Sequence, residues 1–376
     1  MDTEPSNISD IIEPSQNDIA DKLEIFLITY NRASKLKNTL EQLFAENSPI
    51  KGFSITVIDN NSTDKTFDIV QEYCSKYNNL KYLKNKHNIG GNANITKAYC
   101  SANKEYVWVL CDDDMYDWSS WSEVEKAIRD KKDAIMVSTY EKPTLNIAQF
   151  FIQTTFVPGT IYRRDLLDSE VIGNMTYNIS NMFPHLALSS KLINQKRDIH
   201  IVSTGIVIVG DNTDGLTNDD IYTRGYEESN VHPLMRDLNW MTGYANSLYM
   251  ISDKKIRNYI ATHNLFYMPK LNSAQVFFLN SKLSNGSLYN LLSIFLVLNF
   301  WSKIRFIINW LLYYTIFKIV YIHCRAIRTN SDEYIYMQYK IRILNLIKTK
   351  LFTIKIKIKE HNESCYFSGR FGDSFK

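Results

Sequence analysis

Apolar segments that suit β-strands alternate with segments of helical spacing between residues 23 and 114. The four expected strands are Leu23–Thr29, Phe53–Ile58, Leu80–Leu83 and Tyr106–Cys111. The segments between them repeat apolar residues three and four positions apart, and Ser34 stands where it could cap the first helix. This alternation predicts a parallel sheet with right-handed crossovers. We therefore expect an α/β fold in which helices flank a mainly parallel central sheet.

Polar residues cluster after three of these strands and before the third helix. The clusters are Thr29–Arg32, Asp59–Asp64, Asn88–Asn94 and Asp112–Asp114. The carboxyl ends of parallel strands meet at one edge of a sheet, and ligands of α/β proteins bind there. The Asn88 cluster opens a helix, whose free backbone N–H groups favour an anion. The sequence therefore predicts a polar ligand site at one sheet edge.

The last cluster is a run of three acids, Asp112, Asp113 and Asp114. Like charges this close repel one another unless solvent, a cation or basic groups compensate them. Mg²⁺ and Mn²⁺ prefer oxygen ligands, and carboxylates with substrate phosphates make a common site for them. A solvated acidic turn would explain the triplet alone. Its place beside the other polar clusters favours a metal and a phosphate-bearing ligand.

Composition excludes several classes of protein. Hydrophobic residues make up 45% and charged residues 22% of the 376 residues, which is typical of globular chains. The net charge of +3 is too small to indicate nucleic acid, and no nucleic-acid-binding motif is recognisable. The five cysteines form no CxxC pair, so the sequence predicts neither a zinc site nor a disulfide framework, and it favours a cytoplasmic setting. No secretory signal is evident at the N-terminus.

The polar clusters, in their order and spacing, resemble the motifs of glycosyltransferase family 2. The resemblance is clearest over Leu23–Asp114 and extends to about Gly215. It implies the GT-A fold. Three further segments are similar to the abequosyltransferase-like branch of bacterial O-antigen and capsule transferases: Val157–Arg164, Phe183–His185 and Gly210–Asn212.

The resemblance implies roles for individual residues. Donor-binding residues would be Thr29, Tyr30, Arg32, Asp59, Asn61, Asn88, Gly90, Asn94, Asp112 and Asp113, with Asp64 supporting the loop. The acids Asp112, Asp113 and Asp114 would hold Mg²⁺ or Mn²⁺ against the diphosphate. Cys111 stands where many members carry the first acid of the metal motif. Two alternatives follow, in which either Asp112 and Asp114 bind the metal together or Asp113 is the principal ligand.

Inverting chemistry also follows from the resemblance, with transfer of a sugar from a nucleotide diphosphate to an acceptor hydroxyl. A general base must take the hydroxyl proton. The expected candidates for this catalytic role are His185, whose imidazole titrates near working pH, and Asp211. For both, structural roles are the alternatives: a hydrogen-bonded or acceptor-binding histidine, and a turn-forming aspartate. Arg163 and Arg164 are either contacts for acceptor phosphates or a solvated surface pair.

The C-terminal third differs in composition from the rest. Two apolar and aromatic runs, Leu288–Trp301 and Phe306–Phe317, are shorter than the ~20 residues of a spanning helix. The basic, apolar segment Lys340–Lys359 suits an anionic membrane surface. We expect helices that associate with the membrane interface, with internal packing or a homo-oligomer interface as alternatives.

The expected organisation has three parts: an acidic flexible tail over residues 1–21, a GT-A domain over 22–280, and a helical, basic region over 281–376. The nucleotide-sugar half of the domain would span about 22–115 and the acceptor half about 116–280. Expected partners are a nucleotide-diphosphate sugar, a lipid-linked glycan acceptor and the inner face of the cytoplasmic membrane. The alternatives are a transferase for protein or soluble acceptors and a non-catalytic scaffold of a glycan-assembly complex.

Overall fold

The computed structural model describes residues 16–138, 145–210 and 242–266, together with residues 295–298, 300, 301, 303, 304 and 307. The chain divides into two compact units. The first unit consists of Met1–Pro143, Thr154–Thr176 and Arg197–Asn218, and the second of Thr144–Gln153, Tyr177–Lys196 and Asp219–Lys376.

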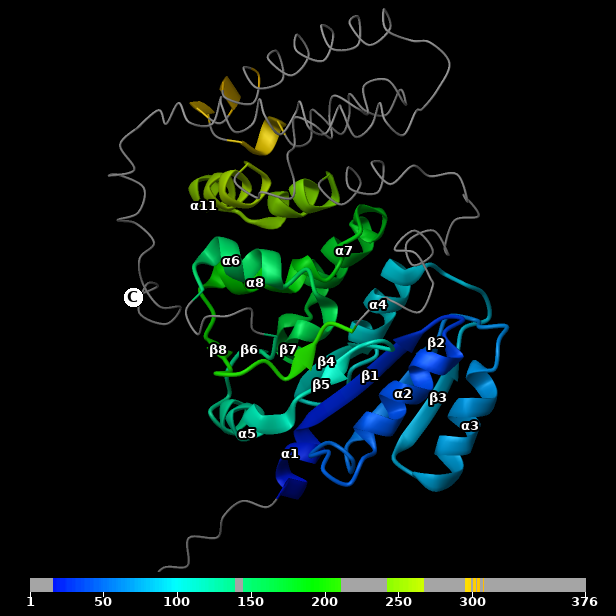
Figure 1. Ribbon diagram of the computed structural model, residues 1–376. Coiled ribbons are helices and arrows are strands. Elements are labelled where there is room, and N and C mark those ends of the chain that lie inside the picture. The colour runs from blue at the N-terminus through cyan, green and yellow to red at the C-terminus, as the bar shows by residue number, and fades with distance from the viewer. Residues whose placement is uncertain are drawn as a thin grey trace, which may run out of the picture. The chain divides into compact units, whose positions relative to one another are not determined.

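The first unit is built on a seven-stranded sheet with the order β3-β2-β1-β4-β7-β6-β8 (Figure 1). Its strands are β1 (Leu23–Thr29), β2 (Ser54–Asp59), β3 (Leu80–Lys84), β4 (Tyr106–Cys111), β6 (Ala134–Met136), β7 (Thr160–Arg163) and β8 (Ile199–Ile201). Strand β7 runs antiparallel to β4 and β6, and the other neighbouring pairs are parallel. The sheet is therefore mixed and mostly parallel. A small two-stranded sheet pairs β5 (Met115–Tyr116) with β9 (Val207–Ile208).

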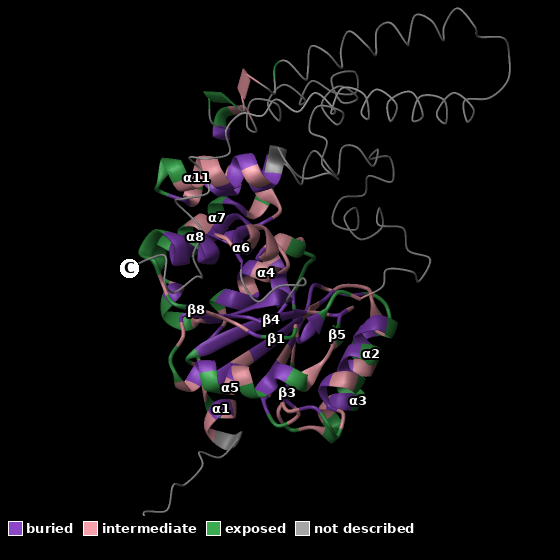
Figure 2. Cartoon of the chain, turned by 60° about the vertical axis from the view of Figure 1, so that its left-hand side comes forward, coloured by how far each residue is buried: buried purple, intermediate pink, exposed green. Residues whose placement is uncertain are grey.

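Helices link and cover the strands of this unit. They are α1 (Gln16–Lys22), α2 (Ala33–Leu43), α3 (Thr66–Lys76), α4 (Gly91–Cys100), α5 (Trp121–Arg129) and α7 (Ser169–Tyr177, of which the last residue belongs to the second unit). Helices α2 and α3 lie on one face of the sheet and α4 on the other (Figures 1 and 2). The change of face follows from the strand order, because the chain adds β2 and β3 on one side of β1 and then returns to place β4 on the other.

Strands β1, β2 and β4 are mostly buried, the edge strand β3 is largely exposed, and the outward faces of the helices are exposed (Figure 2). Strand β4 is apolar along its length because helices cover both faces of a parallel sheet. At its centre, Trp108 donates its indole N–H to the carbonyl of Pro158 at 2.8 Å and stacks on Trp121 with ring centroids 6.3 Å apart. Leu36 and Leu40 of α2 belong to the same core.

The described part of the second unit is helical. It contains α6 (Ile147–Gln153), α8 (Leu186–Gln195), α11 (Lys254–Ala261), helical residues 242–247 and a π-helix at Thr262–Phe266. The fully buried Phe151 and Tyr244 lie edge to face, with centroids 5.6 Å apart. Short 3-10 turns complete the two units: Trp118–Ser120, Val157–Gly159, Arg164–Leu166, Ile179–Asn181 and Leu248–Met250.

The expected mainly parallel α/β sheet is confirmed, and strands β1 and β4 have the predicted bounds. The expected cap at Ser34 is wrong, because α2 begins after Arg32 and has no side-chain cap from its own first residues. The expected flexible tail over residues 1–21 is wrong at its end, because residues 16–21 belong to helix α1, which leads directly into β1. Residues 1–15, Asp211 and most of 281–376 lie outside the described residues. In the part of the chain that is described, no helix has the length and apolar character needed to cross a membrane.

Candidate active site

Three neighbouring parallel strands end in polar residues at one edge of the sheet. In the registers of these strands, Thr29 of β1 pairs with Asp59 of β2, and Ile28 pairs with Cys111 of β4. The strand order changes direction between β1 and β4, and such a switch point is where α/β sheets bind ligands. The polar clusters predicted from the sequence after these three strands therefore lie on one rim.

The first acid of the triplet, Asp112, is held from two sides. The Thr29 hydroxyl donates to its Oδ2 at 2.6 Å, and Arg32 Nη1 donates to its Oδ1 at 2.8 Å. Arg32 Nη2 donates to Asp113 Oδ2 at 2.6 Å. Burial raises the pKa of Asp112 to about 6, against the opposing effect of the Arg32 charge. Both oxygens of Asp112 are thus engaged by the protein itself.

The third acid is buried differently. Asp114 is 3% exposed, and its Oδ2 has no hydrogen-bond partner among the described residues. Burial, followed by the neighbouring Asp113 charge, raises the pKa of Asp114 to about 7. Gln42 of α2 fixes the backbone here, donating to the Asp114 carbonyl at 3.3 Å and accepting from the Tyr116 N–H at 3.2 Å.

Gly210 closes over the same loop. Its N–H donates to Asp114 Oδ1 at 3.4 Å, and a Cβ on this residue would lie 1.6 Å from the Asp113 carbonyl oxygen. Only a glycine can approach a backbone oxygen this closely. The Gly-Asp-Asn segment singled out from the sequence therefore touches the acid loop through its glycine.

Ligand atoms of Cys111, Asp113 and Asp114 lie within 4.8 Å of one another. The two carboxylates are the hard oxygen donors that Mg²⁺ and Mn²⁺ prefer. A buried carboxylate oxygen that finds no partner in the described part of the chain, as Asp114 Oδ2 does, suits a metal ligand. Burial, and then the three acids, raise the pKa of the Cys111 thiol well above its ordinary value. The residues fit a hard divalent cation held chiefly by Asp113 and Asp114.

The loop after β2 is shaped by its own polar side chains. Asp59 is fully buried and accepts from the Ser62 N–H at 2.8 Å and from the Tyr82 hydroxyl at 2.6 Å. Asn61 adopts a left-handed conformation with φ 70°, which asparagine tolerates better than most residues. Tyr30 and Asn61 are half-buried.

Asp64 joins two helices. Its Oδ2 accepts from the Ala33 N–H at 2.9 Å, and its Oδ1 accepts from the Thr66 N–H at 3.1 Å and from the Thr66 hydroxyl at 2.6 Å. The N-terminus of α2 is thus capped by a residue 31 positions away in sequence. Although burial opposes them, these hydrogen bonds lower the pKa of Asp64.

Four asparagines form a network beneath the start of α4. Asn60 donates to Asn88 Oδ1 at 2.6 Å and accepts from Asn85 Nδ2 at 2.9 Å, and Asn85 also donates to Asn94 Oδ1 at 3.0 Å. Asn88 Oδ1 additionally accepts from the Gly90 N–H. Gly90 itself has φ 85°, a conformation that favours glycine. Asn88 is exposed, whereas Asn94 is buried and braces the loop.

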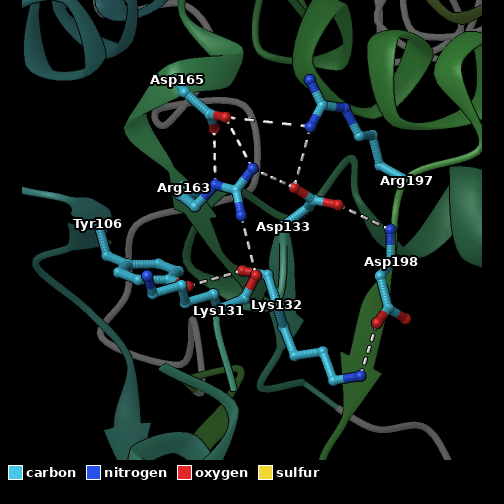
Figure 3. Close-up of polar contacts among 8 residues, drawn as sticks. All are labelled: Tyr106, Lys131, Lys132, Asp133, Arg163, Asp165, Arg197 and Asp198. Atoms are coloured by element: carbon cyan, nitrogen blue, oxygen red, sulfur yellow. Dashed lines mark hydrogen bonds and ion pairs between the residues drawn. The ribbon is translucent and has the colours of Figure 1, made fainter. Parts of the chain in front are cut away.

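The two arginines at the end of β7 contact different groups, and Figure 3 shows the contacts of Arg163. Arg163 Nε and Nη2 donate to the two oxygens of Asp165 at 2.8 and 2.7 Å, and Nη2 also lies 2.7 Å from Asp133 Oδ1. Its Nη1 donates to the Lys131 carbonyl. Arg164 donates to the Ala102 carbonyl at 2.7 Å. Arg163 is therefore engaged in an ion-pair cluster with Asp165 and Asp133, and the expected contact of the arginine pair with acceptor phosphates stays a prediction.

His185 belongs to the second unit, where it is 2% exposed and precedes the first residue of α8. Its ring meets that of Phe183 edge to face at 6.2 Å. Asp211, the other expected base, lies outside the described residues.

The sequence motifs did not predict site roles for Gln42, Asn60, Tyr82, Asn85 or Gly210. Asn60 and Gly210 lie inside two of the predicted motifs, so their residue types could have indicated amide hydrogen bonding and close backbone approach. Gln42 and Tyr82 carry no local signal, because each reaches the site from a helix or strand whose position depends on the whole sheet.

Comparison with known proteins adds an independent finding. A model of the family described as Glycosyl transferase family 2 matches residues 24–194. Dolichyl-phosphate β-glucosyltransferase of Trichomonas vaginalis is 25% identical over 175 residues, which are 41% of this chain and 53% of the relative. Abequosyltransferase of Salmonella typhimurium, one of several distant relatives, is 30% identical over 87 residues, 23% of this chain and 26% of the relative. The chain spans about half or less of the length of the curated relatives it matches.

Among solved structures, that of S. aureus TarS 1–349 in complex with UDP-GlcNAc superposes with a TM-score of 0.52 and 16% identity. The match covers 74% of this chain and 82% of that chain. Likeness at this identity supports a common GT-A-like fold.

Proposed function

We propose, from the premise that residues 24–194 belong to glycosyl transferase family 2, that this protein transfers a sugar from a nucleotide-diphosphate donor to a hydroxyl of a glycan acceptor. The single observation that carries the proposal is the rim where Thr29, Arg32 and the acids meet at the switch point between β1 and β4. A basic guanidinium, a group of carboxylates and a helix N-terminus on one rim suit a diphosphate together with a divalent cation.

In this proposal the donor occupies the rim. Tyr30, Asp59 and Asn61 form the part that receives the nucleoside, with Asp59 acting through the loop that it holds. Asn88 and Gly90, supported by Asn94, line the part that receives the diphosphate or donor sugar. Arg32 and the Thr29–Asp112 pair adjoin the diphosphate.

Asp113 and Asp114 would hold Mg²⁺ or Mn²⁺. Asp112 would orient Arg32 and add its own negative charge to the loop. A cation bound there stabilises the negative charge that grows on the diphosphate as the sugar leaves. The buried oxygen of Asp114, which has no partner among the residues that the structure describes, supports this assignment.

The acceptor hydroxyl must lose a proton as it attacks the anomeric carbon from the opposite face. We propose that either His185 or Asp211 is the general base that accepts this proton. The acceptor is proposed to be a lipid-linked glycan of a bacterial surface polysaccharide, reached from the inner face of the membrane. The support is the name of a bacterial relative, GalNAc(5)-diNAcBac-PP-undecaprenol β-1,3-glucosyltransferase of Campylobacter jejuni, whose named acceptor is a lipid-linked glycan, together with the basic, apolar composition of Lys340–Lys359.

The test is a screen of nucleotide sugars for Mn²⁺- or Mg²⁺-dependent hydrolysis and transfer by the full chain. Asp114→Asn should lose at least about 100-fold in turnover, as expected for loss of a charge-stabilising group. Asp130→Asn, which changes an exposed acid at the end of α5, is the matched control and should keep full activity.

Metal-independent turnover, or full activity of Asp114→Asn in chelator, would refute the metal assignment. Transfer to soluble or protein acceptors alone would favour the alternative acceptor class. A folded chain that binds no nucleotide sugar would favour the scaffold.

A further inference from the structure

The guanidinium of Arg32 stands between two carboxylates of the acid loop. It donates to Asp112 at 2.8 Å and to Asp113 at 2.6 Å, and its side chain is 15% exposed. The hydroxyl of Thr29 takes the remaining oxygen of Asp112. Asp112 thus anchors Arg32, and Arg32 in turn covers one oxygen of Asp113.

The same Asp113 belongs to the group that fits a divalent cation, together with Asp114. A cation arriving at this pair meets a fixed positive charge that is already hydrogen-bonded to one of its ligands. Two effects oppose its binding: repulsion between the guanidinium and the metal, and competition for the Asp113 carboxylate. An arginine guanidinium is not deprotonated in proteins, so Arg32 keeps its positive charge beside these acids.

We propose, on the basis of the metal-dependent transfer argued above, that Arg32 is an internal counter-cation that keeps metal affinity low until a donor diphosphate binds. The diphosphate offers Arg32 a second set of anionic oxygens and adds ligands for the metal. Metal and donor then bind with positive coupling, and by linkage each raises the affinity for the other by the same factor. Arg32 is in this view a positioning residue.

Binding of Mn²⁺ to the full chain without nucleotide tests this directly, with free Mn²⁺ measured by electron paramagnetic resonance. Arg32→Gln keeps a polar side chain but removes the charge, and should bind Mn²⁺ about tenfold more tightly than the wild type, as expected when a nearby like charge is removed. Arg32→Lys keeps the charge and should stay within about threefold of the wild type. Arg129→Gln removes an arginine paired with Glu125 on α5 and should leave Mn²⁺ affinity unchanged.

The second arm repeats the titrations with saturating UDP as a diphosphate probe. The wild type should gain Mn²⁺ affinity on UDP binding by a larger factor than Arg32→Gln. Thermal melting of each variant identifies any loss of folding. If Arg32→Gln unfolds, Arg32→Lys takes its place as the test. Because Arg32→Lys keeps the positive charge, it must preserve both the weak Mn²⁺ binding and the coupling of that binding to UDP.

The outcomes separate this inference from the proposed function. Equal Mn²⁺ affinity in wild type and folded Arg32→Gln would overturn the counter-cation role and leave the metal site standing. Weaker binding by Arg32→Gln would overturn it as well, because Arg32 would then be organising the metal ligands. Absence of Mn²⁺ binding in every variant, with and without UDP, would refute the metal-dependent function and this inference together.

Discussion

The hydrogen bond between Thr29 and Asp112 should make a measurable contribution to the stability of the first unit. Both residues are buried, at 4% and 2% exposure, and the oxygen atoms lie 2.6 Å apart. A hydrogen bond to a charged acceptor contributes about 1.5–3 kcal/mol, and the cost of its loss is greatest where water cannot replace the donor. Thr29→Val removes the hydroxyl at nearly constant volume, so the free energy of unfolding should fall by about 2 kcal/mol.

Urea unfolding followed by tryptophan fluorescence provides the measurement, because Trp108 and Trp121 stack in the core of the same unit. Thr29→Ser keeps the hydroxyl and should cost less than about 1 kcal/mol, the value of one buried methyl group. A double-mutant cycle with Asp112→Asn isolates the pair and should give a coupling energy above about 1 kcal/mol. A coupling energy near zero, or equal costs for Thr29→Val and Thr29→Ser, would refute the reasoning.

Three further predictions follow from the site. Gly210→Ala should destabilise the first unit by about 3 kcal/mol or more and lower activity, since its Cβ would overlap the Asp113 carbonyl; urea unfolding checks this, and a neutral effect would contradict the close approach. The raised pKa of Asp114, about 7, means that the folded state binds a proton that the unfolded state has released above pH ~4. Unfolding free energy in chelator should therefore fall as pH rises from about 4 to 7, and Asp114→Asn should flatten that profile; parallel profiles would argue against it. Finally, His185→Ala or Asp211→Asn should lower turnover at least about 100-fold with little change in donor affinity, depending on which residue is the base; near-normal turnover in both variants would remove both from that role.

Local pattern was enough to predict part of this fold. Strands β1 and β4 have the predicted bounds because each is an apolar run that ends abruptly in polar residues. The antiparallel strand β7 lies inside Val157–Arg164, a segment that the sequence marked only by its similarity to other transferases. Its insertion between β4 and β6 could not be deduced from the sequence, because partner choice depends on tertiary packing. The same holds for the small sheet of β5 and β9.

The candidate site, like the fold, could be predicted from the sequence only in part. The acids, Thr29 and Arg32 were predicted from ordered motifs, and these side chains are in contact. The sequence left open which acids would bind a metal. The structure engages Asp112 with Thr29 and Arg32 and groups Asp113 with Asp114, a distinction that depends on side-chain directions. The cap of α2 was expected from the nearby Ser34, but Asp64 provides it across the loops, since a distant carboxylate can bond two helices at once.

The asparagine network and the acid loop, which lie on the same rim, respond differently to pH. Asn60, Asn85, Asn88 and Asn94 carry no titratable proton, so acidity within the physiological range leaves their hydrogen bonds unchanged. The acid loop, by contrast, loses negative charge as pH falls, because burial raises the pKa of Asp112 to about 6 and that of Asp114 to about 7. A fall in pH through this range would therefore weaken the proposed binding of a cation to the acids, while the asparagine network would keep its hydrogen bonds.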